Sequence, residues 1–140
     1  GYWRDPELTD RILTDGWFHT GDLARTDERG YVFIVGRTKE MIKYKGYTVA
    51  PAELEALLLE HPQVKDCAVV GVADREAGEI PKAFVVLIPG GSADGDALME
   101  FLRSKVAGYK RVRQIELVDA IPRSPSGKIL RRLLAQKSQE

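Results

Sequence analysis

One stretch decides the fold of this chain, and it reads Gly36-Arg37-Thr38-Lys39-Glu40-Met41-Ile42-Lys43-Tyr44-Lys45-Gly46-Tyr47-Thr48-Val49-Ala50-Pro51-Ala52-Glu53-Leu54-Glu55. Met41-Ile42 and Thr48-Val49 are strand-like pairs on either side of a basic turn. Gly46 can supply a positive φ in that turn, so the pattern predicts a tight hairpin. Pro51 suits the first turn of a helix, and Glu53 suits the positive end of its dipole. The stretch therefore predicts a stiff hairpin between a charged link and a helix, which can move as one body.

Apolar patterning on both sides of this stretch predicts further strands and helices. Before it, two strand-like runs flank the turn-rich residues 27–30 and predict another β-hairpin. After it, apolar residues at helical or strand spacing predict helices over 52–59, from about 94, and over 129–136, and strands over 64–72, 82–88 and 114–118. This order predicts an α+β fold, a small three-stranded sheet with helices packed on it plus β-hairpins.

The composition is that of an ordinary soluble globular protein, with 44% hydrophobic and 30% charged residues. A chain of 140 residues suffices for one compact domain and is too short for a large two-domain enzyme. The formal net charge of zero gives no overall attraction to nucleic acid or membrane. From Phe101 onward, however, basic residues outnumber Glu116, Asp119 and Glu140. Such a basic end can contact phosphates or form solvated helix faces, and both readings stay open.

A single cysteine excludes an internal disulfide framework and fits a reducing compartment. It lies in the apolar run Cys67-Ala68-Val69-Val70, which predicts a buried core thiol and not a nucleophile. There is no signal-peptide pattern and no apolar run long enough to span a bilayer. The first residue is Gly1 and not Met, so we expect a fragment of a longer protein.

Three motifs make the chain resemble the adenylate-forming enzymes, which include acyl- and aryl-CoA ligases, luciferases and the adenylation domains of non-ribosomal peptide synthetases. They are Thr20-Gly21-Asp22, the stretch from Ile42 to Glu55, and Pro122-Arg123-Ser124-Pro125-Ser126-Gly127-Lys128-Ile129-Leu130-Arg131-Arg132. The second motif is most similar to the luciferase and coumarate-CoA ligase branch. The resemblance implies that residues 1–38 are a β-hairpin ending the large N-terminal nucleotide-binding domain. Residues 39–140 would then be the C-terminal swinging domain of an AMP-forming synthetase.

The resemblance assigns two residues to the nucleotide. From turn statistics alone, Asp22 is an aspartate that caps its neighbours. The resemblance implies that its carboxylate accepts hydrogen bonds from both ribose hydroxyls of ATP and of the acyl-adenylate, a role that suits an acceptor-only group. Arg37 would add charge-assisted bonds to the same nucleotide, and the alternative for Arg37 is a surface ion pair with Glu40.

The hinge and the hairpin tip would serve domain movement and CoA. Lys39 occupies the family's hinge position, although the residue alone is indistinguishable from an ordinary exposed lysine. Without the family, Lys43, Lys45 and Gly46 predict a solvated turn. The resemblance implies that this tip enters the active site for the second half-reaction and lines the pantetheine tunnel. There Gly46 would let the backbone approach closely, and the two lysines would be electrostatic or positioning residues.

The third motif presents Lys128 ahead of a short helix. Gly-Lys alone is a weak signal, and the string lacks the pattern of a phosphate-binding loop. The resemblance implies that Lys128 is catalytic, entering the site during adenylation and bridging the substrate carboxylate and the α-phosphate. A cation there neutralises the charge that develops at phosphorus.

The function implied is that of a C-terminal fragment of an ATP-dependent acyl- or aryl-CoA ligase, which activates a carboxylic acid as acyl-AMP and transfers it to CoA. The alternatives are an adenylation domain that loads a carrier protein and an inactive stand-alone binding domain. The implied partners are a carboxylic acid, ATP, CoA, the N-terminal large domain, and Mg²⁺ with ligands outside this chain. No metal site, nucleic-acid partner or membrane span is expected.

The chain alone is expected to be inactive and to bind ATP weakly, because it supplies one wall of a nucleotide site. The resemblance also implies a cytoplasmic location. A peroxisomal one stays open for a eukaryotic source, although the last residues show no peroxisomal signal.

Limited proteolysis tests the predicted organisation. We expect residues 39–134 to fold as one unit with helices over one face of the sheet, and the segment before Gly36 to be a hairpin with a weakly packed lead-in. The first cuts should therefore fall within residues 1–16 or near Lys39, identified by mass spectrometry. First cuts inside residues 64–88 would contradict this organisation.

Overall fold

The computed structural model describes residues 1–138, so the last two residues, including Glu140 of the C-terminal charge count and the end of the predicted 39–140 domain, lie outside it. The described chain forms two compact units, Gly1–Lys39 and the described residues from Glu40 onward. The assignment of the two units to a large and a swinging domain stays a prediction. None of the helices in residues 1–138 is long and apolar enough to cross a membrane.

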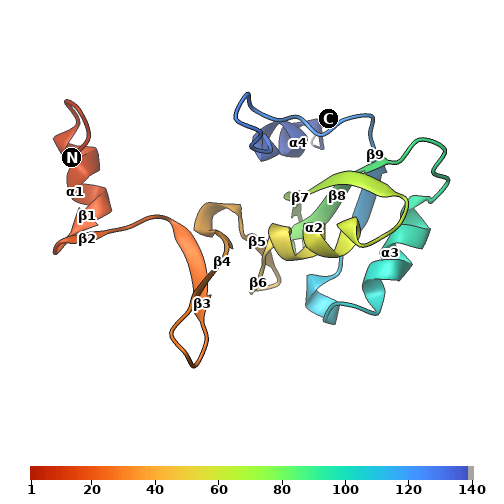
Figure 1. The fold of residues 1–140 in the computed structure, drawn as a ribbon, viewed down its shortest axis with the longest axis horizontal. Coiled ribbons are helices and arrows are strands. Elements are labelled where there is room, and N and C mark those ends of the chain that lie inside the picture. Colours follow the sequence, from red (N-terminus) through yellow and green to blue (C-terminus); the bar gives the residue numbers. More distant parts are fainter. Residues whose placement is uncertain (139–140) are drawn as a thin grey trace. The chain divides into compact units, whose positions relative to one another are not determined.

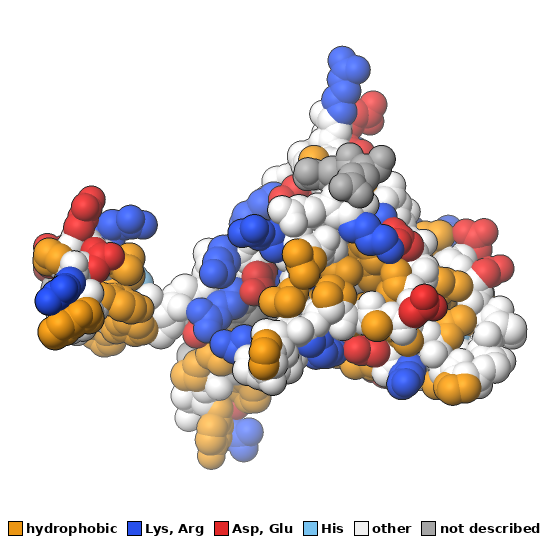
Figure 2. Space-filling view, turned by 90° about the horizontal axis from the view of Figure 1, so that it is seen from above, with side chains coloured by type: hydrophobic (Ala, Val, Ile, Leu, Met, Phe, Trp, Pro, Cys, Tyr) orange, Lys and Arg blue, Asp and Glu red, His pale blue; other side chains and the backbone are white. Residues whose placement is uncertain are grey.

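The first unit consists of short elements with little packing. They are α1 (Pro6–Ile12), β1 (Leu13–Thr14) paired with β2 (Trp17–Phe18), and β3 (Asp22–Thr26) paired with β4 (Val32–Arg37) (Figure 1). The β3–β4 pair confirms the predicted hairpin, whose turn is held by Asp27 Oδ1 accepting from the backbone N–H groups of Arg29 and Tyr31 at 3.0 and 2.9 Å. No side chain of residues 1–39 is buried. Trp3 and Trp17 are accordingly exposed, and Figure 2 shows apolar side chains at the surface of this unit.

The second unit is built on one mixed sheet. After the 3₁₀ turn η1 (Thr38–Glu40), its elements are β5 (Ile42–Tyr44), β6 (Tyr47–Val49), α2 (Pro51–Leu59), β7 (Val64–Asp74), β8 (Gly78–Leu87), α3 (Gly95–Arg103), η2 (Gly108–Lys110), β9 (Gln114–Leu117) and α4 (Arg131–Lys137). β8 pairs antiparallel with β7 and parallel with β9, which confirms the three predicted main strands. The basic hairpin β5–β6 joins the same sheet through the pair Tyr44 and Gly78, so the sheet has five strands.

The two longest strands, β7 and β8, bury side chains on both faces of the sheet. One cluster contains Cys67 and Val69 with leucines of α2 and α3, and a second contains Val70 and Phe84 with Leu134 of α4. The expectation that helices cover only one face is therefore wrong. The physical reason is visible in the strands, since a continuous apolar run is typical of a strand that is buried on both faces.

The C-terminal helix begins two residues later than predicted. Before α4, Ile129 forms a bridge with Arg123, and the N–H of Leu130 donates to the carbonyl oxygen of Pro122 at 2.9 Å. These bonds hold the residues before Arg131 in an extended loop. Within α4 only Leu134 is buried, whereas Leu133 is exposed.

The single cysteine is a core residue, as predicted. Cys67 is buried, and its thiol donates to the carbonyl oxygen of Glu55 at 3.5 Å. Burial raises the pKa of Cys67 to about 12, with further contributions from the negative charges of Glu55 and Asp66. The neutral thiol is therefore favoured in the folded chain, which argues against a nucleophilic role at neutral pH.

Alkylation kinetics test this assignment. At pH 8 iodoacetamide should label Cys67 more than about 100-fold slower in the folded chain than in urea, because the reactive thiolate is suppressed. The raised pKa also sets a pH dependence. Its contribution to stability is full below about pH 8.5, the pKa of a free cysteine, and is lost as the pH rises towards the folded value. Equal labelling rates with and without urea would contradict a core thiol.

Candidate functional site

The β3–β4 hairpin brings together the two residues predicted to bind nucleotide. Asp22 and Arg37 are register partners, and Arg37 Nε lies 2.8 Å from Asp22 Oδ1. A second nitrogen, Arg37 Nη1, donates to the carbonyl oxygen of Thr20 at 3.3 Å. Arg37 thus pairs with Asp22 within the first unit, whereas Glu40, in the second unit, accepts from Arg131. The structure thus brings Asp22 and Arg37 together, and their binding of one nucleotide stays a prediction.

The Asp22 carboxylate keeps acceptor capacity for a ligand. Its side chain is 26% exposed and that of Arg37 is 50% exposed, so both are reachable from solvent. Asp22 Oδ2 has no hydrogen-bond partner among residues 1–138. Because an ionised carboxylate only accepts, the free oxygen and the remaining lone pair of Oδ1 can receive two neighbouring hydroxyl groups.

The tip of the basic hairpin is a two-residue turn. Tyr44 pairs with Tyr47, and the turn residues Lys45 and Gly46 have φ values of 47° and 82°. Two consecutive positive φ angles are typical of the type I′ turn, which matches the twist of the flanking strands. A Cβ at Gly46 would meet no atom within 4 Å. In this chain, glycine is therefore favoured by the backbone conformation and not by crowding.

Aromatic and ionic contacts hold both strands of the hairpin. Tyr47 stacks on Tyr109 of η2 with ring centroids 4.6 Å apart. Arg113 lies over the Tyr44 ring at 4.9 Å and donates to the Tyr44 hydroxyl at 3.1 Å. The backbone N–H of Lys43 donates to the Glu79 carboxylate at 2.7 Å. The hairpin is thus braced along its length, and these supporting residues lie too far along the chain for a local sequence pattern to reveal them.

Lys128 lies exposed on a loop that is itself well bonded. The N–H of Lys128 donates to Ser124 Oγ at 3.2 Å, and its carbonyl oxygen accepts from the N–H of Ser124 at 2.9 Å. Gly127 has a φ of 82°, which this tight turn requires. Arg123 donates to the carbonyl oxygen of Gly127 at 3.0 Å. The loop therefore presents the lysine on a defined backbone, in the second unit.

The remaining predicted residue, Lys39, is exposed and is the last residue of the first unit. It lies within η1, so the boundary between the units falls at the predicted hinge position. That position does not show motion, and the hinge role stays a prediction.

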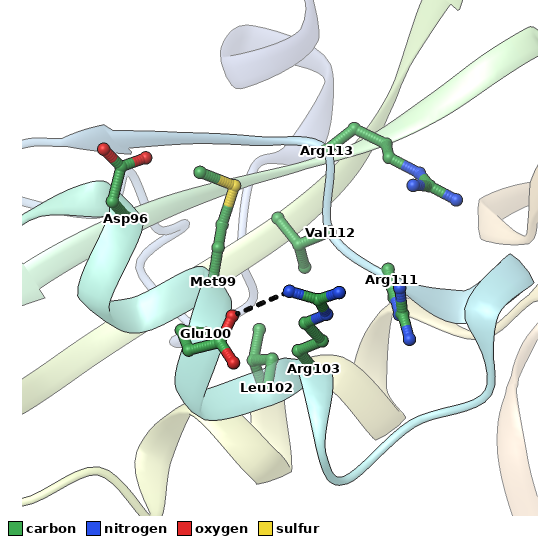
Figure 3. Close-up of a pocket in the computed structure, with 8 residues that line it drawn as sticks. All are labelled: Asp96, Met99, Glu100, Leu102, Arg103, Arg111, Val112 and Arg113. Atoms are coloured by element: carbon green, nitrogen blue, oxygen red, sulfur yellow. Dashed lines mark hydrogen bonds and ion pairs between the residues drawn. The ribbon is translucent and has the colours of Figure 1, made fainter.

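The second unit also has an open cavity of about 310 Å³ between α3 and residues 111–113 (Figure 3). Three arginines and two acidic residues share its lining, which consists of Asp96, Met99, Glu100, Leu102, Arg103, Arg111, Val112 and Arg113. Arg111 Nε is buried without a hydrogen-bond partner among the described residues. Figure 2 likewise shows basic and acidic side chains on the same face of this unit. The basic C-terminal part can therefore still be either a phosphate-contacting surface or a set of solvated helix faces.

The fold and these sites define a class, the small α+β domain of adenylate-forming enzymes with a basic hairpin and a lysine-bearing loop. Residues 53–128 match the AMP-binding enzyme C-terminal domain family, and the chain belongs to that family. This membership confirms the resemblance inferred from the three motifs.

Relatives and solved structures agree with this family. The chain is 53% identical over 138 residues to 4-coumarate–CoA ligase-like 1 of Arabidopsis thaliana, covering 98% of this chain and 26% of that protein. It is 52% identical to peroxisomal OPC-8:0-CoA ligase 1 of the same plant, covering 94% of this chain and 24% of that protein. ATP-bound MatB from Rhodopseudomonas palustris has a TM-score of 0.94 and 36% identity, covering 100% of this chain and 28% of that chain. The chain spans about a quarter of the length of these proteins.

The aromatic brace of the hairpin generates a stability prediction. Tyr109→Ala removes the stack on Tyr47 and should lower the free energy of unfolding. The expected loss is about 0.5–1.5 kcal/mol from the aromatic pair, in addition to the loss of buried area. Tyr109→Phe keeps the ring and should remain close to the wild-type chain. Urea unfolding followed by circular dichroism measures both. Equal loss in the two variants would show that the stack contributes nothing.

Proposed function

We propose that the protein containing this chain is an AMP-forming acid–thiol ligase. In the first step a carboxylate attacks the α-phosphate of ATP, giving the acyl-adenylate and releasing pyrophosphate. In the second step the thiol of CoA attacks the acyl carbon, giving the thioester and releasing AMP. The observation that carries the proposal is the similarity to a protein named as a CoA ligase over 98% of the chain, which spans all three motifs.

The first step would use residues of both units. Asp22 would receive the ribose hydroxyls, and Arg37, already bonded to Asp22 Oδ1, would fix the orientation of that carboxylate and contact the nucleotide. Lys128 would bring a positive charge to the reacting carboxylate and α-phosphate. Its exposure on an internally bonded loop supports this role, since a preorganised charge needs little rearrangement as the reaction proceeds.

The second step would use the basic hairpin. The braced strands would carry the turn Lys45-Gly46 into the site as one piece, where Gly46 exposes backbone beside the path of the thiol. Lys43 and Lys45 would contribute positive charge near the CoA chain. Lys39 would be the hinge, because it lies at the boundary between the two compact units. Rotation about it would replace the Lys128 loop in the active site by this hairpin.

Mg²⁺ would accompany ATP as part of the substrate. Within residues 1–138 no three His, Cys, Asp or Glu side chains are grouped so that they could hold a metal ion. No step is therefore assigned to a metal ligand of this chain.

Two features favour CoA over a carrier protein as the acceptor. The hairpin string Ile42-Lys43-Tyr44-Lys45-Gly46 is ligase-like, and the most similar relatives include several proteins named as CoA ligases. The relatives' names cover both an aromatic acid, 4-coumarate, and OPC-8:0, so the proposal extends to acyl or aryl acids without choosing one. The name of one relative also keeps a peroxisomal location open beside the cytoplasmic one.

The two half-reactions can be tested separately in the full-length protein. Lys128→Ala should lower the rate of pyrophosphate release by roughly 10²–10³-fold, because a preorganised charge at the transition state is lost. Thioester formation from supplied acyl-adenylate should stay close to the wild-type rate. Gly46→Leu should do the reverse, since the added side chain would obstruct the thiol.

Matched controls exist for both variants. Lys65 is likewise an exposed lysine of the second unit, and Lys65→Ala should leave both half-reactions unchanged. Gly90 has a φ of 78° and open space around it, so Gly90→Leu carries the same backbone strain as Gly46→Leu away from the hairpin. If Lys128→Ala and Gly46→Leu each weaken both steps equally, the division of labour between the two elements is wrong.

A further inference from the structure

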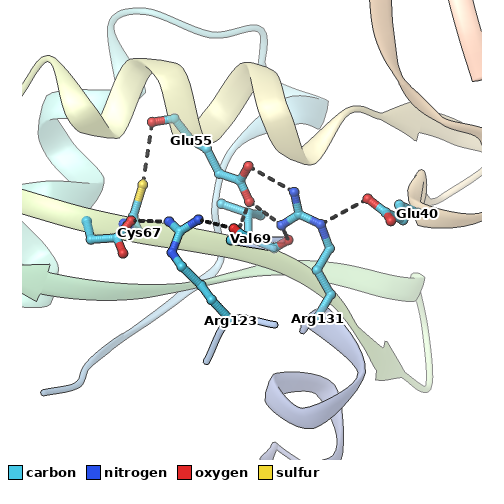
Figure 4. A network of polar contacts seen from close by, with 8 residues as sticks. Glu40, Glu55, Cys67, Val69, Arg123 and Arg131 are labelled. Atoms are coloured by element: carbon cyan, nitrogen blue, oxygen red, sulfur yellow. Dashed lines mark hydrogen bonds and ion pairs between the residues drawn. The ribbon is translucent and has the colours of Figure 1, made fainter. Parts of the chain in front are cut away.

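The most extensive polar network in the second unit surrounds Arg131, the first residue of α4 (Figure 4). Arg131 Nη1 and Nη2 bind the two carboxylate oxygens of Glu55 on α2, the latter at 3.0 Å. Nη1 also donates to the carbonyl oxygen of Val69 on β7 at 3.1 Å, and Nε donates to Glu40 at 3.1 Å. One guanidinium thus joins four elements of this unit.

Glu55 completes the arrangement from the other side. Its Oε1 accepts from the backbone N–H of Val69 at 2.7 Å. Among the described strands, β7 pairs only with β8, so its other edge has free backbone groups. Glu55 and Arg131 together satisfy both the N–H and the C=O of Val69, in the manner of a neighbouring strand.

This ion pair differs from the surface pairs of the chain in its burial. The side chain of Glu55 is 12% exposed and that of Arg131 is 20% exposed. Burial lowers the pKa of Arg131, but the hydrogen bonds and charges of Glu55 and Glu40 outweigh this effect, so the pKa lies above its ordinary value. Removing one member of such a pair leaves the other charge buried without compensation, which is strongly unfavourable.

The network holds one end of the loop that carries Lys128. At the other end, Arg123 Nη2 donates to Asp66 Oδ1 at 2.8 Å, and the same oxygen accepts from the N–H of Cys67 at 2.9 Å. Both ends of the loop are therefore fastened by arginines to the free edge of β7 (Figure 4). The fastening does not depend on α4 packing alone, since α4 has one buried residue, Leu134.

We propose that Arg131, anchored by Glu55, is a positioning residue that fixes the Lys128 loop on the edge of β7 and joins it to Glu40, the residue after the hinge position. The inference rests on the proposed function for the role of Lys128. Its consequence is mechanical, since the start of the second unit and the lysine loop move as one body. A lysine delivered by rotation about a hinge reaches its target reproducibly only if the loop does not move independently.

The catalytic arm of the test uses the full-length protein. Arg131→Met should lower the kcat of pyrophosphate release by about 10–100-fold, the scale expected for slight misplacement of a catalytic group. The KM for ATP should change far less, and thioester formation from supplied acyl-adenylate should be retained. Arg131→Lys, which keeps the charge on a single donor nitrogen, should restore part of the rate. Arg132→Met is the matched control, because Arg132 is exposed and has no ion pair among the described contacts.

The structural arm uses the 140-residue chain itself and is independent of activity. Amide hydrogen exchange in Arg131→Met should accelerate at Val69 and in residues 124–130, whereas Val85 in the centre of the sheet should remain protected. If amide exchange at Val69 and in the loop is unchanged, the proposal that Arg131 fixes the loop on the edge of β7 is refuted. If both half-reactions fall by the same factor, Arg131 supports the fold in general and the positioning role is refuted.

The two arms distinguish failure of this inference from failure of the proposed function. A wild-type protein that releases no pyrophosphate with any carboxylic acid would refute the proposed function. The exchange measurement would still decide whether Arg131 and Glu55 hold the loop on β7. If Arg131→Met fails to fold, Arg131→Lys decides the question. The proposal requires that amide exchange in Arg131→Lys accelerates at Val69 and in residues 124–130. It also requires that pyrophosphate release by this variant falls while thioester formation does not.

Discussion

The second unit depends on the antiparallel pairing of β7 and β8. Their register runs from Val64 opposite Leu87 to Asp74 opposite Gly78, and side chains of both strands are buried on both faces. Several other elements of this unit attach directly to that pair. The hairpin β5–β6 and the strand β9 attach along β8, whereas α2 and α4 contact β7. The free energy gained by burying apolar side chains is roughly proportional to the area buried. A pair of strands that is buried on both faces therefore supplies most of the hydrophobic stabilisation of this small domain.

Local chemistry made much of the architecture predictable. Gly46 and its basic neighbours indicated the tight turn, and Pro51 indicated the start of α2, because both residues restrict the backbone where they stand. Asp22 and Arg37 were assigned to one ligand through family resemblance, and the register of β3 and β4 later placed them together. Such features depend on a few adjacent residues or on one hairpin.

The parts that could not be predicted depend on distant residues. Glu55 and Arg131 are separated by 76 positions, and nothing local marks either as the partner of the other. Glu55 fits equally well as an acidic residue near a helix start, and Arg131 as one of several exposed cations. Arg37 and Glu40, close in sequence, appeared to be a natural pair, yet the sheet directs Arg37 to Asp22. Proximity along a chain says little about ion pairs once strands determine where side chains point.

The way in which Val69 is satisfied has a consequence for association between molecules. An exposed strand edge is a template on which another chain can add its own strand, and proteins protect such edges with charges or covering segments. Here Glu55 and Arg131 occupy the template at its centre and place two charges where an incoming strand would have to lie. The pair that we propose to order the lysine loop thus also hinders strand addition at this edge, and opening the pair would expose the backbone groups of Val69 to another chain.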